Sequence, residues 1–197
     1  MQQVEKRKES ASEKLLKAAH ILFYNYGINA TGIDAIVKRA GVAKKSLYNN
    51  FTSKDELIAV YLQERHEEWL SLYKMRLSQA TTPREKVLSI FKAYEDHAQF
   101  KYENGFRGCG LLNASAELSA NSPLRQLVRY HKQEVETLLL KHLTELTGHN
   151  NNKAQRLARH FSFLLEGSIT RAGLENSSEY VTQATLMAED MLSTIDE

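Results

Sequence analysis

One stretch of the sequence, residues 31–57, constrains the fold more than any other. Its first part carries apolar residues at helical spacing, which predicts a short amphipathic helix over residues 33–40. Gly41 follows directly, and a residue without Cβ adopts positive φ at little cost, so a sharp turn is expected there. The apolar face of this first helix consists of Ile33, Ile36, Val37 and Ala40.

The second part of this stretch has two chemically different sides. Ala43, Leu47 and Phe51 share one side of a predicted helix, whereas Lys45 and Asn49 point almost opposite. Lysine can neutralise phosphate or donate to guanine, and asparagine can pair with adenine in the major groove. Two helices clamped across a short turn, with donors on the outer side, are typical of a helix-turn-helix.

Capping patterns predict where several helices begin. A hydroxyl residue followed three positions later by an acidic residue is a capping box. Each proline that follows a hydroxyl residue fits the first position of a helix, and Lys54 beside exposed helix amides is a candidate phosphate contact. The boxes are Ser10 with Glu13, Thr31 with Asp34, and Ser53 with Glu56; the proline starts are Thr82-Pro83 and Ser122-Pro123.

The block GVAKKSLYNNFTSKDEL, preceded by TGIDAIVKRA, resembles the DNA-binding domain of the TetR family of bacterial transcriptional regulators. The resemblance is specific over residues 10–60. One departure is Ala43, where many members carry Ser or Thr, so the second helix lacks a side-chain cap there. The alternative is that the lysines only solvate a surface. The DNA-contacting residues that we expect are Thr31, Lys44, Lys45, Ser46, Tyr48, Asn49 and Lys54.

Composition and charge are consistent with an N-terminal DNA-binding domain followed by a larger helical domain. With 197 residues, 42% of them hydrophobic, and only two prolines, the chain can bury a sizeable core. Strict apolar alternation is absent, so the fold class expected is all-α with about nine helices. We expect a helix-turn-helix domain over residues 1–54 and a helical ligand-binding and dimerisation domain over 55–197. Residues 1–54 carry a net charge of +6 against −4 for the remainder, and Lys6, Arg7 and Lys8 could reach the DNA backbone.

Other classes of function find little support in the sequence. The single cysteine, Cys109, excludes an intrachain disulfide, and no apolar run approaches the roughly 20 residues of a membrane span. We therefore expect a cytoplasmic protein without membrane attachment. The spacing of histidines and carboxylates indicates no metal site, no cofactor and no catalytic constellation, so an enzyme is not expected.

Aromatic residues surround a glycine-rich bend, FKYENGFRGCG, in the C-terminal body. They suggest a pocket for a small ligand, although such a stripe more often forms core. Cys109, between two glycines and near Arg107, has the alternative roles of an oxidant or electrophile sensor and of a packing residue. The expected pocket residues are Trp69, Phe91, Tyr94, Cys109 and Asn113.

The last two predicted helices are apolar on more than one side. They could complete the core of a single chain, or bury the extra surface against a second copy. Resemblance to the family implies a four-helix dimer interface at this place. The residues expected there are Phe161, Leu164, Leu165, Ser168, Ala184, Met187 and Met191.

The resemblance implies a homodimeric transcriptional regulator, most simply a repressor that a small-molecule ligand releases from a palindromic double-stranded DNA operator. Two alternatives stay open from the sequence. One is a thiol-based sensor that uses Cys109 on the same fold. The other is a helical ligand carrier or scaffold that does not bind DNA.

Overall fold

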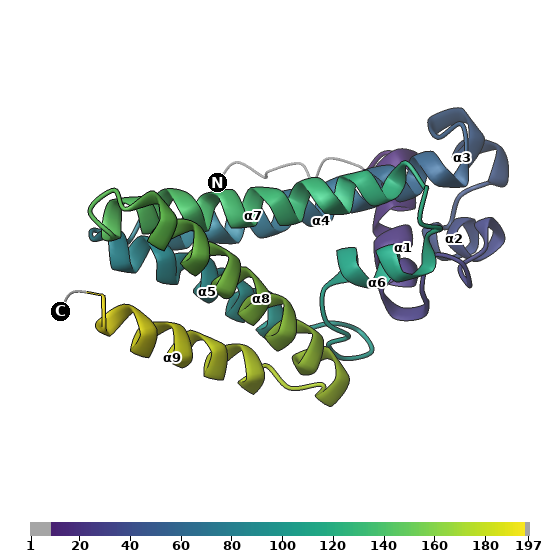
Figure 1. The fold of residues 1–197 in the computed structure, drawn as a ribbon. Coiled ribbons are helices and arrows are strands. Elements are labelled where there is room, and N and C mark those ends of the chain that lie inside the picture. Colours follow the sequence, from purple (N-terminus) through teal and green to yellow (C-terminus); the bar gives the residue numbers. More distant parts are fainter. Residues whose placement is uncertain (1–8, 196–197) are drawn as a thin grey trace, which may run out of the picture. The chain divides into compact units, whose positions relative to one another are not determined.

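The computed structural model describes residues 9–195, which contain nine α-helices and no strand, so the all-α prediction is confirmed (Figure 1). Lys6, Arg7 and Lys8 lie outside the described residues. No helix in the described part is long and apolar enough to cross a membrane. The helices are α1 (Ala11–Tyr26), α2 (Ile33–Ala40), α3 (Lys44–Asn50), α4 (Lys54–Leu77), α5 (Pro83–Gln99), α6 (Gly110–Glu117), α7 (Leu124–Leu146), α8 (Asn151–Glu175) and α9 (Glu179–Ser193).

The chain divides into two compact units, of which the first ends at Tyr61 and the second begins at Leu62. The first unit therefore includes the opening turns of α4 as well as α1, α2 and α3. Its first helix begins as expected, because Ser10 Oγ accepts the Glu13 N–H at 3.2 Å and the Glu13 carboxylate accepts the Ser10 N–H at 2.7 Å. Helix α1 packs against both α2 and α3.

The turn between α2 and α3 has the predicted geometry. Gly41 lies in the left-handed region, with φ of 63°, and the Val42 N–H donates to the Val37 carbonyl at 3.2 Å. Helix α3 then begins after Ala43 without a side-chain cap. Leu47 is fully buried, and Phe51 at the end of α3 is nearly so. These two apolar side chains hold α3 against the unit.

The predicted capping box at Thr31 was wrong. The N-cap of α2 is Gly32, and no side chain caps that helix. The Thr31 side chain is instead buried, at 3% exposure, and its hydroxyl donates to the carbonyl oxygens of Gly27 and Leu22 at 2.7 and 3.2 Å. The last carbonyls of a helix lack partners within the helix, so Thr31 satisfies the end of α1 rather than the start of α2.

Two further helix starts differ slightly from the prediction. The Ser53 hydroxyl accepts the Glu56 N–H at 3.1 Å, but the Glu56 carboxylate accepts from the backbone and hydroxyl of Thr52. Helix α7 begins at Leu124, one residue after the proline, with Pro123 at the N-cap position. The start of α5 is confirmed, with Thr82 and Glu85 in a reciprocal box and Pro83 at the first position.

The second unit is built around α5, which packs against α7, α8 and α9. In Figure 1 the C-terminal helix α9 runs along this group next to α8. At the centre, the rings of Phe91 and Phe161 meet edge to face with centroids 5.5 Å apart, and both side chains are fully buried. Phe91 is thus a core residue between α5 and α8.

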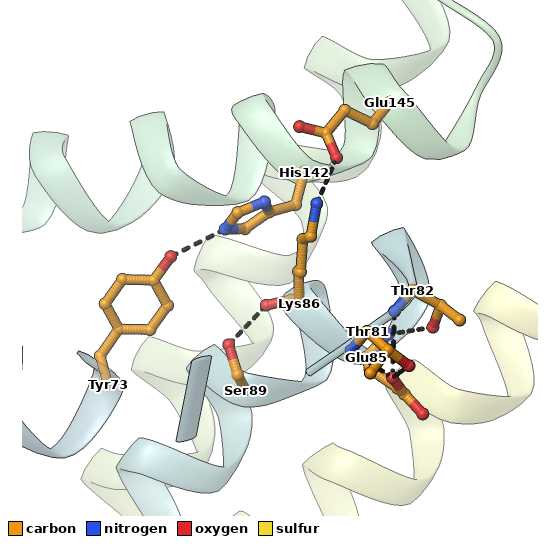
Figure 2. A network of polar contacts seen from close by, with 8 residues as sticks. All are labelled: Tyr73, Thr81, Thr82, Glu85, Lys86, Ser89, His142 and Glu145. Carbon is orange, nitrogen blue, oxygen red and sulfur yellow. Dashed lines mark hydrogen bonds and ion pairs between the residues drawn. The ribbon is translucent and has the colours of Figure 1, made fainter. Parts of the chain in front are cut away.

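Polar contacts tie α4, α5 and α7 together at one end of this unit (Figure 2). Burial raises the pKa of Tyr73 to about 12 and lowers the pKa of His142, so the Tyr73 hydroxyl stays protonated, and it shares a hydrogen bond with His142 Nε2 at 2.7 Å. Nearby, Lys86 of α5 reaches Glu145 of α7 at 2.9 Å. These contacts help to fix the register of the three helices.

A second polar contact lies deeper, between α4 and α7. The Nδ1 atoms of His66 and His131 are 2.9 Å apart, so one of them has to accept the hydrogen bond. Burial first, and then nearby Lys132, lower the pKa of His131 to about 2. Burial likewise lowers the pKa of His97 to about 3. Both imidazoles are therefore neutral in the folded protein near neutral pH.

The two neutral histidines predict a loss of stability in acid. In the unfolded chain both protonate near pH 6.5, whereas in the folded chain they do not, so the unfolded state binds more protons below that pH. The free energy of unfolding should fall by about 3 kcal/mol between pH 6.5 and 5 from these two groups together. Urea denaturation of wild type and His131→Gln across this range measures the effect.

The His131→Gln variant should show a shallower dependence on pH, by about 1.4 kcal/mol per pH unit. The matched control is His160→Gln, because His160 is exposed on α8. An unchanged slope in His131→Gln, or an equal change in both variants, would contradict the assignment.

Candidate functional site

The outer side of α3 presents a group of polar side chains without partners. Lys45, Tyr48 and Asn49 are all exposed, Tyr48 at 53%. None of the three makes a hydrogen bond or ion pair with another described residue. Their direction follows from the opposite side of the helix, where Leu47 and Phe51 are buried. An exposed ridge of one cation, one amide and one phenol can donate to both phosphates and base edges.

The other polar residues near α3 are less free. The Lys44 ammonium lies 2.8 Å from the Asp34 carboxylate of α2, and this hydrogen bond raises the pKa of Lys44. Ser46 and Lys54 are half-buried. A phosphate that approaches Lys44 has to compete with Asp34, so Lys45 is the more available cation.

The start of α4 carries its own negative charge. Hydrogen bonds from the hydroxyl and the backbone of Thr52 lower the pKa of Glu56, so its carboxylate stays ionised. It occupies the Thr52 N–H that a phosphate would otherwise use. Lys54 is therefore a weaker candidate for a phosphate contact than the sequence indicated.

Thr31 is the one expected DNA-contacting residue that the structure removes from the surface. Its buried hydroxyl donates hydrogen bonds to carbonyl oxygens at the end of α1. Sequence reasoning missed this because Gly27, with φ of 91°, turns the chain back over its own helix. The Thr31 hydroxyl thus ties the segment just before α2 to the end of α1.

A second group of polar and aromatic residues surrounds a small cavity of about 10 Å³ in the C-terminal unit, space for about one water molecule. Three of the five expected pocket residues line it, namely Trp69, Tyr94 and Cys109. Phe91 does not, since it packs on Phe161, and Asn113 instead donates to the Arg107 carbonyl at 2.9 Å. The remaining lining residues are Arg65, His97, Gly110, Leu111 and His131.

Lys132 is a neighbour of this cavity that sequence reasoning missed. Its ammonium lies 2.8 Å from the Glu166 carboxylate, 3.8 Å from Cys109 Sγ and 5.8 Å from the centre of the Tyr94 ring. Burial lowers the pKa of Lys132, but Cys109, Tyr94 and Glu166 outweigh it and leave the pKa raised. Lys132 therefore stays charged. Nothing near it in sequence predicts these partners, which come from other helices.

The described residues contain no group of three or more His, Cys, Asp or Glu side chains placed to hold a metal ion. The candidate sites are thus the ridge on α3 and the cavity in the second unit.

Comparison with known proteins bears on both units. Residues 15–61 match the family model described as "Bacterial regulatory proteins, tetR family". The HTH-type transcriptional repressor KstR2 of Mycolicibacterium smegmatis is 32% identical over 84 residues, which span 43% of this chain and 41% of that protein. The HTH-type transcriptional regulator LmrA of Bacillus subtilis is 29% identical over 160 residues, 80% of this chain and 83% of that protein.

The solved structures extend the likeness to the whole fold. SCO4454, a TetR-family transcriptional regulator from Streptomyces coelicolor, superposes with a TM-score of 0.86 at 25% identity, over 95% of this chain and 96% of that chain. The chain is a TetR-family protein. The matched family segment coincides with the unit that carries the α3 ridge.

The last two helices of this TetR-family chain have an inner and an outer apolar side. Of the seven expected interface residues, Phe161, Leu165, Ser168 and Ala184 are buried within their own unit. Met187 is exposed, and Leu164 and Met191 are half-buried. The large exposed apolar side chains of the two helices are Phe163, Leu174, Leu186 and Met187, and of these only Met187 is among the expected interface residues.

Proposed function

We propose that this TetR-family protein is a sequence-specific DNA-binding transcriptional regulator that acts as a homodimer. Its DNA target would be a palindromic operator, and a small molecule bound in the C-terminal unit would release it. The observation that carries this proposal is the exposed ridge on α3, where Lys45, Tyr48 and Asn49 project without partners. Such a ridge on the second helix of a helix-turn-helix fits the major groove.

The ridge supports direct reading of sequence as well as attraction to DNA. Asn49 can form two hydrogen bonds with one adenine, and Lys45 can donate to guanine or to phosphate. A helical carrier without DNA affinity has no need for three exposed, unpartnered donors beside one another. The regulator therefore accounts for these residues better than the scaffold does.

A second copy of the chain is the natural cover for the outward face of α8 and α9. Phe163 and Leu174 are 68% and 77% exposed. Large apolar side chains that are this exposed rarely occur as a group on the surface of a monomer. Two-fold symmetry would then place two α3 helices on successive major grooves, about one helical turn apart. The operator half-sites should accordingly be inverted repeats.

Release by a ligand would work through differential affinity. The two DNA-binding units of a dimer bind the operator only when their spacing matches it. A ligand weakens operator binding to the extent that it binds more tightly to a conformation with another spacing than to the DNA-binding conformation. The cavity beside Trp69 and Tyr94 is a site where such a ligand could act.

A thiol-based switch is a second candidate, which the contact between Cys109 and Lys132 favours. The ammonium at 3.8 Å stabilises negative charge that forms on the sulfur, and the thiolate is the form that oxidants and electrophiles attack. The thiol is buried, so a reagent has to pass the cavity wall. Modification of this atom would disturb the Lys132 and Glu166 pair between α7 and α8.

The DNA-binding proposal predicts distinct effects of two substitutions. Asn49→Ala should lose about 1–3 kcal/mol of binding to the chain's own upstream intergenic DNA but little to unrelated DNA, because it removes a base contact. Lys45→Ala, if phosphate is its target, should make the slope of log binding constant against log salt concentration shallower by about one. Fluorescence anisotropy at several salt concentrations measures both.

The matched control is Lys92→Ala, because Lys92 is an exposed lysine on α5 of the other unit. It should bind as the wild type does. Weak, salt-insensitive binding by the wild type, or variants on α3 that bind as tightly as the control, would exclude the regulator in favour of the scaffold.

The dimer proposal predicts that Phe163→Asp dissociates the protein. Each dimer would lose two buried phenylalanines, at about 1.5–3 kcal/mol each, so its dissociation constant should rise about a hundredfold or more. Sedimentation velocity over a range of concentrations measures the change. Phe100→Asp is the matched control, because Phe100 has the same exposed fraction, 68%, on another surface. A Phe163→Asp protein that sediments as the wild type would contradict this face as the interface.

The thiol candidate predicts that peroxide or a quinone releases wild-type protein from operator DNA and that Cys109→Ser resists this release. The same anisotropy assay detects it, with each protein also tested untreated. If Cys109→Ser is released as readily as the wild type, the sulfur is not the sensor.

A further inference from the structure

Two buried hydrogen-bond donors beside the cavity have no partner. The indole Nε1 of Trp69 and the hydroxyl of Tyr94 have no acceptor, although the two residues are only 3% and 2% exposed, and the nearby Lys132 ammonium can only donate to the Tyr94 oxygen. Both residues line the cavity, and their rings meet edge to face with centroids 5.6 Å apart. Buried donors without partners are rare in folded proteins and mark places where another group belongs.

The charged groups around the same cavity already have partners. Arg65 lies 2.8 Å from the Glu68 carboxylate, and Lys132 lies 2.8 Å from that of Glu166. Glu166 keeps one buried oxygen, Oε2, without a hydrogen bond, but a carboxylate oxygen only accepts, so the unused donors here are the neutral indole and phenol. A ligand carboxylate would bring a third negative charge to two cations that are each paired already, and it would lose its own hydration.

A larger hollow lies directly outside the cavity. It measures about 350 Å³, and it shares Arg65 and His97 with the cavity wall. Its other lining includes the apolar or aromatic side chains of Leu72, Phe100 and Tyr102. The Arg65 guanidinium donates to the Tyr102 hydroxyl at 2.9 Å across this wall. Arg65 and His97 therefore lie between the outer hollow and the two donors.

We propose that the ligand site of this protein takes an uncharged molecule whose apolar body fills the outer hollow and whose carbonyl oxygen accepts hydrogen bonds from Tyr94 and Trp69. The inference rests on the function proposed above in one respect, namely that this ligand is the effector that releases the protein from DNA. A carbonyl oxygen has two lone pairs and can satisfy both donors at once. A hydrocarbon of the same shape would leave both donors unpartnered, and a carboxylate would add unpaired charge.

The single tryptophan of the chain makes the test direct. Trp69 gives one indole N–H signal in a proton–nitrogen correlation spectrum of the full-length protein, and hydrogen bonding moves that signal downfield. The probes are acetophenone, ethylbenzene and benzoate, which share a ring and differ in the group attached to it. Acetophenone should shift the signal saturably, with a dissociation constant about tenfold below those of the other two.

The Tyr94→Phe protein tests the second donor. Because the hydroxyl donates to no acceptor and only its oxygen interacts with Lys132, its removal should change the melting temperature only slightly. Acetophenone should then bind several-fold more weakly than it binds to the wild type, while the affinity for ethylbenzene stays unchanged. Tyr130→Phe, at an exposed position on α7, is the matched control and should bind all probes as the wild type does.

Three results would overturn the inference. These are benzoate binding as tightly as acetophenone, no loss of acetophenone affinity in Tyr94→Phe, and no saturable shift of the indole signal with any probe. None of these measurements uses DNA, so their failure leaves operator binding standing. Conversely, failure of operator binding would remove the regulator but not the ligand class.

Discussion

The burial of Leu47 and Phe51 is the constraint on which the proposed activity depends. These two side chains fix the rotation of α3 about its axis, because any other rotation would expose them to water. Their burial turns Lys45, Tyr48 and Asn49 outward together. The seven-residue helix is too short to be stable alone, so its direction is set by packing rather than by helix propensity.

The support beneath α3 comes from residues that never reach the surface. Gly41 makes the turn that brings α3 back against α2, and Thr31 ties α2 to the end of α1. The donors of α3 therefore stand on a rigid base, which lowers the entropy lost when they bind. In the second unit, the donors of Trp69 and Tyr94 beside the cavity have no acceptor, and a ligand could supply one.

Local rules in the sequence predicted the parts of the fold that local interactions decide. The Gly41 turn, the Ser10 box and the Thr82-Pro83 start depend on residues within five positions of one another, and all are confirmed. Thr31 was misread because its partners are carbonyls of the preceding helix, outside the window of a capping pattern. The same limit applies to Lys132, whose partners lie 23 and 34 positions away.

Periodicity alone also fails where a helix is apolar on two sides. On α8 the sequence does not say whether Phe161 or Phe163 faces the core, and the structure buries the first and exposes the second. Only the position of α5 decides, because Phe161 packs against Phe91 of that helix. Four of the seven expected interface residues are therefore buried in the core of their own unit, and the dimer interface itself stays a prediction.

The most direct test of this account is site-specific crosslinking from α3 to DNA. In a Cys109→Ser background, a single cysteine replaces Asn49, and the duplex of the upstream region carries thiol-tethered bases in the major groove. We predict rapid disulfide formation from position 49, and almost none when the cysteine instead replaces Ala35, an exposed residue of α2. Equal rates at both positions, or none at either, would contradict the claim that α3 reads the groove.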